Sequence, residues 1–282
     1  MTRRHRFTHA AMATEFEIVF TDPEMDPTEA QGVAALVFRE VDRLEEELSR
    51  FKPSSDVWRI NGLRAGESVY VDYATIDCLM LAKAAHEATN GAFDATAGPL
   101  MTCWRNPDGS SRTPSEQELG QARRSVGMDL IEIDPAETRV SVKADYMTID
   151  LGAVGKGYAL DQAVRILEEQ EVAGALLNAG ASTILAWGLT PSPDGWQLDL
   201  DLSPPVMIGL KDSALSCSGF DVQGAHIMDP RTGHPVPAED KRWYLQAPTA
   251  ALSDALSTAF VVMSADERTA LLKKFPELRH YV

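Results

Sequence analysis

The chain has 282 residues, of which 26 are Lys or Arg and 42 are Asp or Glu, giving a formal net charge of −16. A hydrophobic fraction of 44% and a mean hydropathy of −0.17 are typical of a globular protein and exclude a disordered chain. No apolar run approaches the ~20 residues of a transmembrane helix. The negative charge and the absence of Lys/Arg clusters with interleaved aromatics argue against nucleic acid as a partner. An anionic ligand would therefore need local amides, a lysine or a metal ion.

The three cysteines, Cys78, Cys103 and Cys217, are widely spaced, with no CxxC pair and no zinc-type spacing. We expect buried free thiols. The basic start of the chain is followed by Glu15 and Glu17 before an apolar segment can form, which argues against a signal peptide. As written, the sequence indicates a cytoplasmic protein, or a periplasmic one if a leader has been removed.

Strands and helices are predicted in mixed runs. The first strand covers 15–20, and an amphipathic helix follows in which Val33, Val37, Val41, Leu44 and Leu48 recur at steps of three and four. Further helices are predicted at 73–89, 157–169, 250–263 and 266–275. Further strands are predicted at 130–133, 139–143, 147–151, 175–178, 184–187, 196–200 and 206–210.

These runs show no regular β-α-β rhythm, which favours an α+β fold over a doubly wound sheet. We expect mixed, largely antiparallel sheets with packed helices. Residues 1–282 are predicted to form a single domain, with room for two closely packed lobes and a ligand site between them.

A glycine-rich segment, Asp150-Leu-Gly-Ala-Val-Gly-Lys-Gly-Tyr-Ala, leads into the predicted helix at 157–169. Glycines let backbone amides approach a diphosphate, a helix N-terminus adds partial positive charge, and Lys156 adds a full charge. The segment is not a P-loop, because Asp150 and Gly157 stand where that motif requires Gly and Ser/Thr. An ordinary glycine-rich turn is the alternative.

Asp254 and Thr258 lie four residues apart and therefore share one face of the predicted helix at 250–263. Their oxygens could meet one Mg²⁺, a hard cation that prefers carboxylate, hydroxyl and carbonyl ligands. The alternative is a solvated helix face. Because a metal-facing position is expected to lie outside the core, Asp254→Ala should leave the fold intact.

Two further segments carry candidate side chains. His226 precedes an Asp-Pro-Arg-Thr-Gly turn and is a candidate for catalysis or for a structural role. Phe93 and Asp94 could stack on and bind a ligand, although core packing would explain Phe93 equally well.

Seven blocks in order resemble the ApbE family of FAD:protein FMN transferases. They are Met12-Ala-Thr, the run Leu48–Asn61, Gly91-Ala-Phe-Asp, the run Asp150–Ala159, Leu177-Asn-Ala-Gly, His226-Ile-Met-Asp-Pro-Arg-Thr-Gly and Asp254-Ala-Leu-Ser-Thr-Ala. The resemblance implies an α+β fold that binds FAD with Mg²⁺ and transfers FMN to a threonine hydroxyl of a partner protein, releasing AMP.

The resemblance also implies roles for individual positions. Asp254 and Thr258, with the carbonyl of Ala153, match the metal positions, so Asp254 would act in catalysis through the metal. A base must also take the threonine proton, and because Asp254 is engaged by the metal, we expect His226 to be that base. The positions that match FAD contacts are Met12, Ala92, Phe93, Asp94, Asp150, Lys156 and Ile227. Phe51 does not match the family residue, but it keeps a ring that could pack on FAD.

The chain departs from the family pattern at three places. Ala13 replaces a glycine, Phe51 replaces a tyrosine-type residue, and Gly180-Ala-Ser stands where Gly-Gly-Asp is usual. The last change removes a carboxylate. Two alternatives to transfer therefore stay open: hydrolysis of FAD to FMN and AMP, and FAD binding without turnover.

Overall fold

The computed structural model describes residues 4–106, 108–180, 182–219, 227–237 and 241–282. Within them, an antiparallel seven-stranded sheet has the order β1-β2-β6-β7-β10-β13-β14. Its strands are β1 (His5–Ala11), β2 (Thr14–Phe20), β6 (Gly174–Ala179), β7 (Thr183–Gly188), β10 (Ser213–Ser218), β13 (Trp243–Ala247) and β14 (Arg279–Tyr281). The predicted α+β class with largely antiparallel sheets is confirmed.

Three helices pack along this sheet: α1 (Pro27–Leu48), α6 (Gly155–Glu169) and α7 (Ala250–Val262). Asp26 is the N-cap of α1, and its carboxylate accepts hydrogen bonds from the amides of Thr28 and Glu29. The predicted apolar stripe of α1 is buried. Together these helices bury the main hydrophobic core against the sheet.

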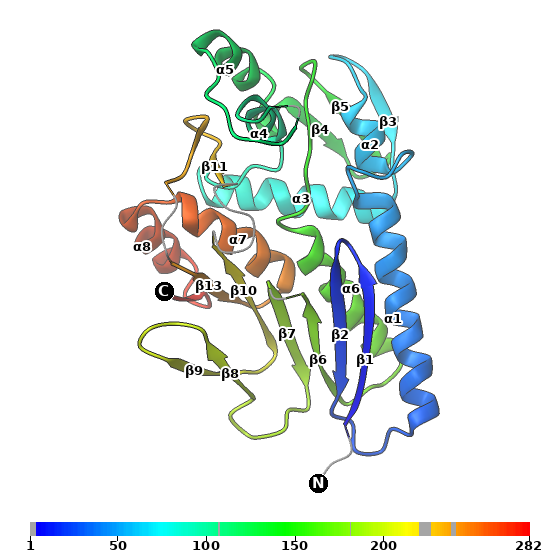
Figure 1. The fold of residues 1–282 in the computed structure, drawn as a ribbon. Helices are drawn as coiled ribbons and strands as arrows, with labels where there is room; N and C mark the ends of the chain where they lie inside the picture. The colour runs from blue at the N-terminus through cyan, green and yellow to red at the C-terminus, as the bar shows by residue number, and fades with distance from the viewer. Residues whose placement is uncertain (1–3, 107, 181, 220–226, 238–240) are drawn as a thin grey trace.

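A second group of elements lies beyond α3 (Tyr73–Ala88), which crosses between the two groups (Figure 1). It contains a three-stranded sheet of order β3-β5-β4 and a separate small hydrophobic cluster. Its elements are α2 (Asp56–Asn61), β3 (Ser68–Tyr70), α4 (Gly98–Cys103), α5 (Glu116–Arg123), a 3₁₀ turn at Met128–Leu130, β4 (Ile131–Asp134) and β5 (Arg139–Val142).

Two hairpins and a final helix complete the described fold. β8 (Trp196–Leu200) and β9 (Val206–Leu210) form one hairpin, which packs against the large sheet through Leu200 and Leu210. β11 (Met228–Asp229) and β12 (His234–Pro235) form the other. α8 (Ala265–Lys274) follows α7. No helix within the described residues has the length and apolar character needed to cross a membrane.

The predicted strand at 147–151 is wrong. The segment 147–151 forms one isolated β-bridge, in which Thr148 pairs in parallel with Ala97. The side-chain amide of Asn61 instead bonds both backbone groups of Ile149, at 2.6 Å and 3.0 Å. A side chain here supplies the hydrogen bonds that a partner strand would otherwise provide.

α6 and α7 approach each other unusually closely at Gly157. A Cβ atom added there would lie 2.2 Å from the carbonyl oxygen of Ala250. Gly157 therefore permits a backbone contact that any larger residue would prevent, and this contact sets the position of α7 beside the glycine-rich turn.

We expect Gly157→Ala to lower the free energy of unfolding by about 1–3 kcal/mol, because the added methyl group overpacks the contact. Gly155→Ala is the matched control in the same helix, since the nearest atom to its added Cβ is 4.0 Å away. The control should be neutral or stabilising by up to ~1 kcal/mol, as Ala is the better helix former. Urea midpoints measure both, and equal midpoints would contradict the close-contact argument.

Candidate functional site

The glycine-rich turn runs from Asp150 into the first turn of α6. The Asp150 amide bonds the carbonyl of Ala95, and the Asp150 carboxylate accepts a hydrogen bond from the Gly152 amide at 2.9 Å. Lys156 then donates from Nζ to the Gly152 carbonyl at 2.9 Å. The predicted cluster is thus a folded turn with Lys156 held across it.

Asp254 faces this turn from the second turn of α7. Its Oδ2 accepts a hydrogen bond from the Gly157 amide at 3.2 Å and lies 4.0 Å from Lys156 Nζ. Its Oδ1 accepts from Thr183 Oγ1 at 3.2 Å. The structure therefore brings Lys156 and Asp254, which are nearly a hundred residues apart, to one place.

The expectation that Asp254 lies outside the core is wrong. The residue is 5% exposed and sits between the turn, α7 and the large sheet. An isolated buried carboxylate is unfavourable, and the amide, the hydroxyl and the ammonium group are what stabilise it here. Removing the carboxylate therefore affects folding as well as any ligand.

Hydroxyl groups extend the site beyond Asp254. Ser218 Oγ lies 3.2 Å from Thr258 Oγ1 and 2.8 Å from Ser257 Oγ. Ser216 Oγ donates to Thr183 Oγ1 at 3.2 Å. Thr183, Ser216 and Ser218 were not predicted from the sequence, although the alternation of Ser216 and Ser218 is a signal that one face of β10 is polar.

The N-terminus of α7 is held by a carboxylate from α6. Asp161 accepts hydrogen bonds from the amides of Ala250 and Ala251, at 2.8 Å and 2.9 Å. Burial raises the pKa of Asp161 to about 6, although these amide bonds oppose the shift. This bond pair fixes the start of α7, and with it the position of Asp254.

The donor set around Asp254 suits a hard cation. Asp254 offers a carboxylate, Thr258 a hydroxyl one helical turn away, and the turn that contains Ala153 offers backbone carbonyls, one of which already accepts from the Lys156 ammonium group. In the described part of the chain, no group of three or more His, Cys, Asp or Glu residues could hold a metal. The predicted set contains a single carboxylate and relies on neutral oxygens.

Phe51 and Asp150 both contact Arg50. The ring is 77% exposed, and the Arg50 guanidinium lies 4.4 Å from its centroid. Arg50 Nε is also 3.1 Å from Asp150 Oδ2. Arg50, which the sequence analysis did not single out, thus covers one face of the ring and joins two predicted flavin positions.

The Ala92–Asp94 segment is largely buried. Ala92 and Phe93 are 2% and 4% exposed and belong to the main core, which agrees with the core-packing interpretation of Phe93. The Asp94 side chain is 3% exposed; it accepts from the amide and hydroxyl of Thr96 and lies 3.2 Å from His86 Nδ1. This hydrogen bond to Asp94 raises the pKa of His86.

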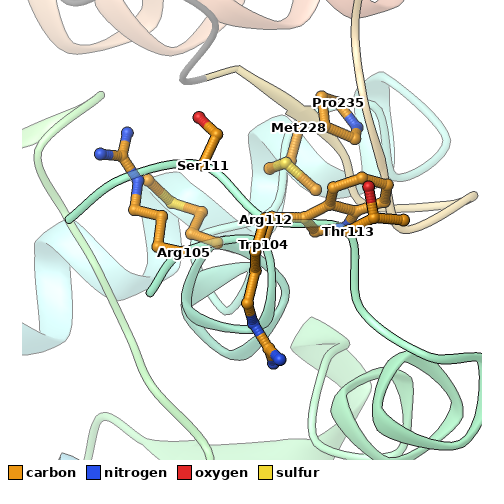
Figure 2. A pocket seen from close by; sticks show the side chains of 8 residues that line it. Trp104, Arg105, Ser111, Arg112, Thr113, Met228 and Pro235 are labelled. Atoms are coloured by element: carbon orange, nitrogen blue, oxygen red, sulfur yellow. The ribbon is translucent and has the colours of Figure 1, made fainter. Parts of the chain in front are cut away.

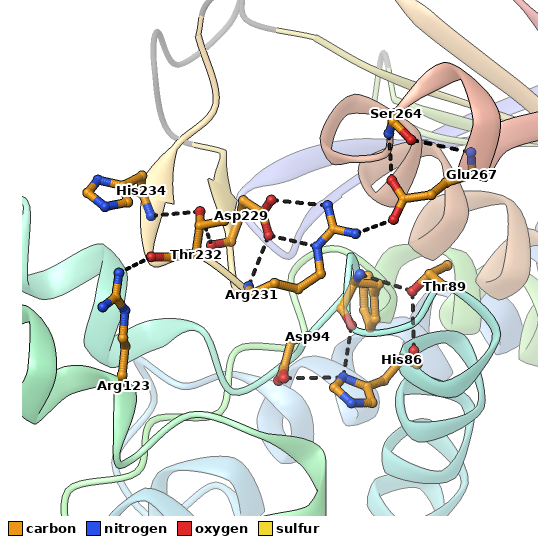
Figure 3. A network of polar contacts seen from close by, with 11 residues as sticks. His86, Thr89, Asp94, Arg123, Asp229, Arg231, Thr232, His234, Ser264 and Glu267 are labelled. Atoms are coloured by element: carbon orange, nitrogen blue, oxygen red, sulfur yellow. Dashed lines mark hydrogen bonds and ion pairs between the residues drawn. The ribbon is translucent and has the colours of Figure 1, made fainter.

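The β11–β12 hairpin is fixed by a network of polar contacts (Figure 3). Arg231 binds both carboxylate oxygens of Asp229 at 3.0 Å and reaches Glu267 of α8 at 2.5 Å. Ile227, 6% exposed, precedes this hairpin. His226 lies outside the described residues, so its predicted role stays a prediction.

Met12 and Ala13 form the two-residue turn between β1 and β2. Their φ angles are +50° and +58°, as a type I′ hairpin turn requires. Met12 packs against the main core. Ala13 takes a left-handed conformation that glycine adopts with less strain. This conformation explains why the family pattern has a glycine at this position.

Comparison with known proteins places these features in a family. The family model described as the ApbE family matches residues 12–282. A protein of Klebsiella pneumoniae (strain 342) named FAD:protein FMN transferase is 24% identical over 268 residues, covering 89% of this chain and 76% of the relative. One of the same name from Haemophilus influenzae is 25% identical over 252 residues, covering 82% and 69%.

Solved structures of the same family share the fold. The flavinyl transferase ApbE of Pseudomonas stutzeri superposes with a TM-score of 0.85 at 23% identity, covering 96% of this chain and 88% of the other. The ApbE protein of Thermotoga maritima gives a TM-score of 0.81 at 27% identity, covering 99% and 93%.

The His86–Asp94 pair predicts a pH-dependent stability. Because the folded-state pKa of His86 lies above its ordinary value of 6.5, the stabilisation is complete below pH 6.5 and is lost as the pH rises through the folded-state pKa. We expect wild type to lose stability relative to His86→Gln between about pH 6 and about pH 8.5. Urea unfolding at both pH values measures this, and a pH-independent difference would contradict it.

Proposed function

Because the chain belongs to the ApbE family, we propose that it is an FAD:protein FMN transferase. It would move FMN from FAD to a threonine hydroxyl of another protein and release AMP. One observation supports the proposal most directly. Lys156 of the glycine-rich turn lies 4.0 Å from the buried carboxylate of Asp254, and Thr258 lies one helical turn from Asp254. Diphosphate chemistry needs such a combination of positive charge and metal-binding oxygens.

The turn and α6 supply the positive part of the site. Lys156 and the amides at the start of α6 would hold the diphosphate of FAD, in a chain whose net charge of −16 otherwise opposes an anion. The Lys156 side chain is 22% exposed, so part of it remains open to a ligand.

The oxygen donors would hold Mg²⁺. Asp254, Thr258 and the carbonyl of Ala153 match the family's metal positions, and their chemistry fits a hard cation. Bound there, Mg²⁺ would neutralise the diphosphate and stabilise the charge that develops on AMP. The Ser218 hydroxyl, which lies 2.8 Å from Ser257 Oγ and 3.2 Å from Thr258 Oγ1, would orient the Thr258 hydroxyl.

The flavin half would be held by residues on several segments. Phe51 presents one open ring face, because Arg50 covers the other. Met12, Ala92, Phe93, Asp94, Asp150 and Ile227 are the remaining positions proposed to contact FAD. The deeply buried ones, Ala92 and Phe93, would shape the wall of the site from within the core. His226 is proposed as the base that takes the threonine proton.

One assay separates transfer from its alternatives. The protein is incubated with FAD and Mg²⁺, with and without an acceptor protein that carries the threonine, and AMP, free FMN and covalent flavin are followed. Covalent flavin formed only with the acceptor supports the proposal. Free FMN without acceptor would identify an FAD pyrophosphatase, and intact FAD in both reactions would identify a binding protein.

Asp254→Asn should lower AMP release by about 10²–10³-fold, because it removes the charged metal ligand while keeping the side-chain volume. Thr258→Ala should be milder, since water can replace a neutral hydroxyl in the metal's shell. Asp254→Ala should also lower stability, as the carboxylate is buried and hydrogen-bonded.

The matched control is Asp266→Asn, an exposed carboxylate in the first turn of α8. AMP release is measured across a Mg²⁺ titration, with urea unfolding of each variant. A folded Asp254→Asn protein with the wild-type rate and Mg²⁺ dependence would remove Asp254 from the metal site.

A further inference from the structure

None of the residues that line a pocket of about 550 Å³ is among the proposed FAD and metal positions. Figure 2 shows the side chains that line it. Met101 of α4, Trp104 and Met228 of β11 give it an apolar floor, and Arg105, Ser111 and Arg112 come from the segment that follows α4. The volume suits a few side chains rather than a simple inorganic anion.

The floor of the pocket is firmly held. Trp104 Nε1 donates to the carbonyl of Gly233 at 2.9 Å, and the Trp104 ring meets the His234 ring edge-on at 5.5 Å. The Arg112 amide bonds the Trp104 carbonyl at 2.9 Å. These contacts join α4, the following segment and the β11–β12 hairpin, so the pocket is formed before any partner arrives.

The pocket is positively charged in a strongly acidic chain. Arg112 pairs with Glu118 of α5 at 2.8 Å and is partly neutralised. Arg105 is exposed, and among the described residues no carboxylate lies within ion-pairing distance of it. Its Nη1 donates to the Gly109 carbonyl at 3.4 Å. With a net charge of −16 around it, an unpaired arginine beside an apolar floor marks a place for an acidic partner.

The β11–β12 hairpin separates this pocket from the proposed flavin site. Ile227, a proposed FAD contact, packs into the main core, whereas Met228 packs into the second cluster with Leu100 and Leu119. Successive residues of an extended chain point to opposite sides. A partner in the pocket would therefore lie within one thin hairpin of the flavin.

We propose that this pocket docks the acceptor protein, by binding an extended segment that carries apolar and acidic side chains close to the threonine to be modified. The inference rests on the proposed function, because a transferase must hold a second, protein substrate beside its flavin. The apolar side chains would cover Trp104 and Met228, and an acidic side chain would pair with Arg105. The two methionines on the floor can adapt to different side chains.

Peptide binding tests the pocket without any need for turnover. The probes are two fluorescein-labelled synthetic peptides with one central Thr and two Leu residues, flanked by Asp in one and by Lys in the other. We expect the Asp peptide to bind wild type at least tenfold more tightly than the Lys peptide, and Arg105→Glu to weaken Asp-peptide binding at least tenfold. FAD affinity, followed by flavin fluorescence, should be unchanged in Arg105→Glu.

The matched control is Arg139→Glu, which makes the same charge change at an exposed position of β5. If this control weakens binding as much as Arg105→Glu does, the effect is long-range charge alone and the docking site is rejected. Equal binding of the two peptides to wild type also rejects it. Inorganic phosphate bound by wild type but not by Arg105→Glu, with neither peptide bound, would replace it with a small-anion site.

The two proposals can fail separately. Intact FAD in the acceptor assay would reject the transferase function, whatever the peptides do. Covalent transfer that proceeds equally well in wild type and Arg105→Glu, at acceptor concentrations below saturation, would reject the docking pocket and leave the transferase function standing.

Discussion

The rest of the structure depends on the close contact between α6 and α7. Gly157 allows the two backbones to meet at Ala250, and Asp161 of α6 binds the first amides of α7. These two contacts fix the distance between α6 and α7 and the residue at which α7 begins. Asp254 consequently lies against the glycine-rich turn, where the Gly157 amide bonds its carboxylate. The contact that packs the helices is therefore also the contact that builds the site.

A buried carboxylate requires compensation, and the surroundings of Asp254 supply it from three directions. The Gly157 amide comes from α6, the Thr183 hydroxyl from β7 and the Lys156 ammonium group from the turn. In a chain of net charge −16, this small region concentrates donors and positive charge where the global field is unfavourable to an anion. A region that satisfies one carboxylate in this way is also suited to phosphate oxygens.

The spacing of apolar and polar residues along the chain predicted the helix faces, because these depend on local sequence alone. The stripe of α1 and the shared face of Asp254 and Thr258 follow from helical spacing, and the structure has both as expected. β1, β10, β13 and β14 were not predicted, because their sequences lack a regular alternation of polar and apolar residues. The hydroxyls around Asp254 depend on the β6-β7-β10 strand order, which brings Thr183 and Ser216 together across 33 residues. Likewise, nothing in 147–151 indicates that Asn61 replaces a partner strand there.

The β11–β12 hairpin is a very small element that is held by contacts from α5 and from α8. Two residues per strand cannot form a stable ribbon alone. Arg231 compensates by binding Asp229 within the hairpin and Glu267 on α8, and Arg123 of α5 bonds the Thr232 carbonyl from the other side (Figure 3). Held from both directions, the hairpin is a fixed wall. Ile227 packs into the main core while Met228 packs into the second cluster and lines the basic pocket. On the two proposals above, one short segment would contact both the flavin nucleotide and the acceptor.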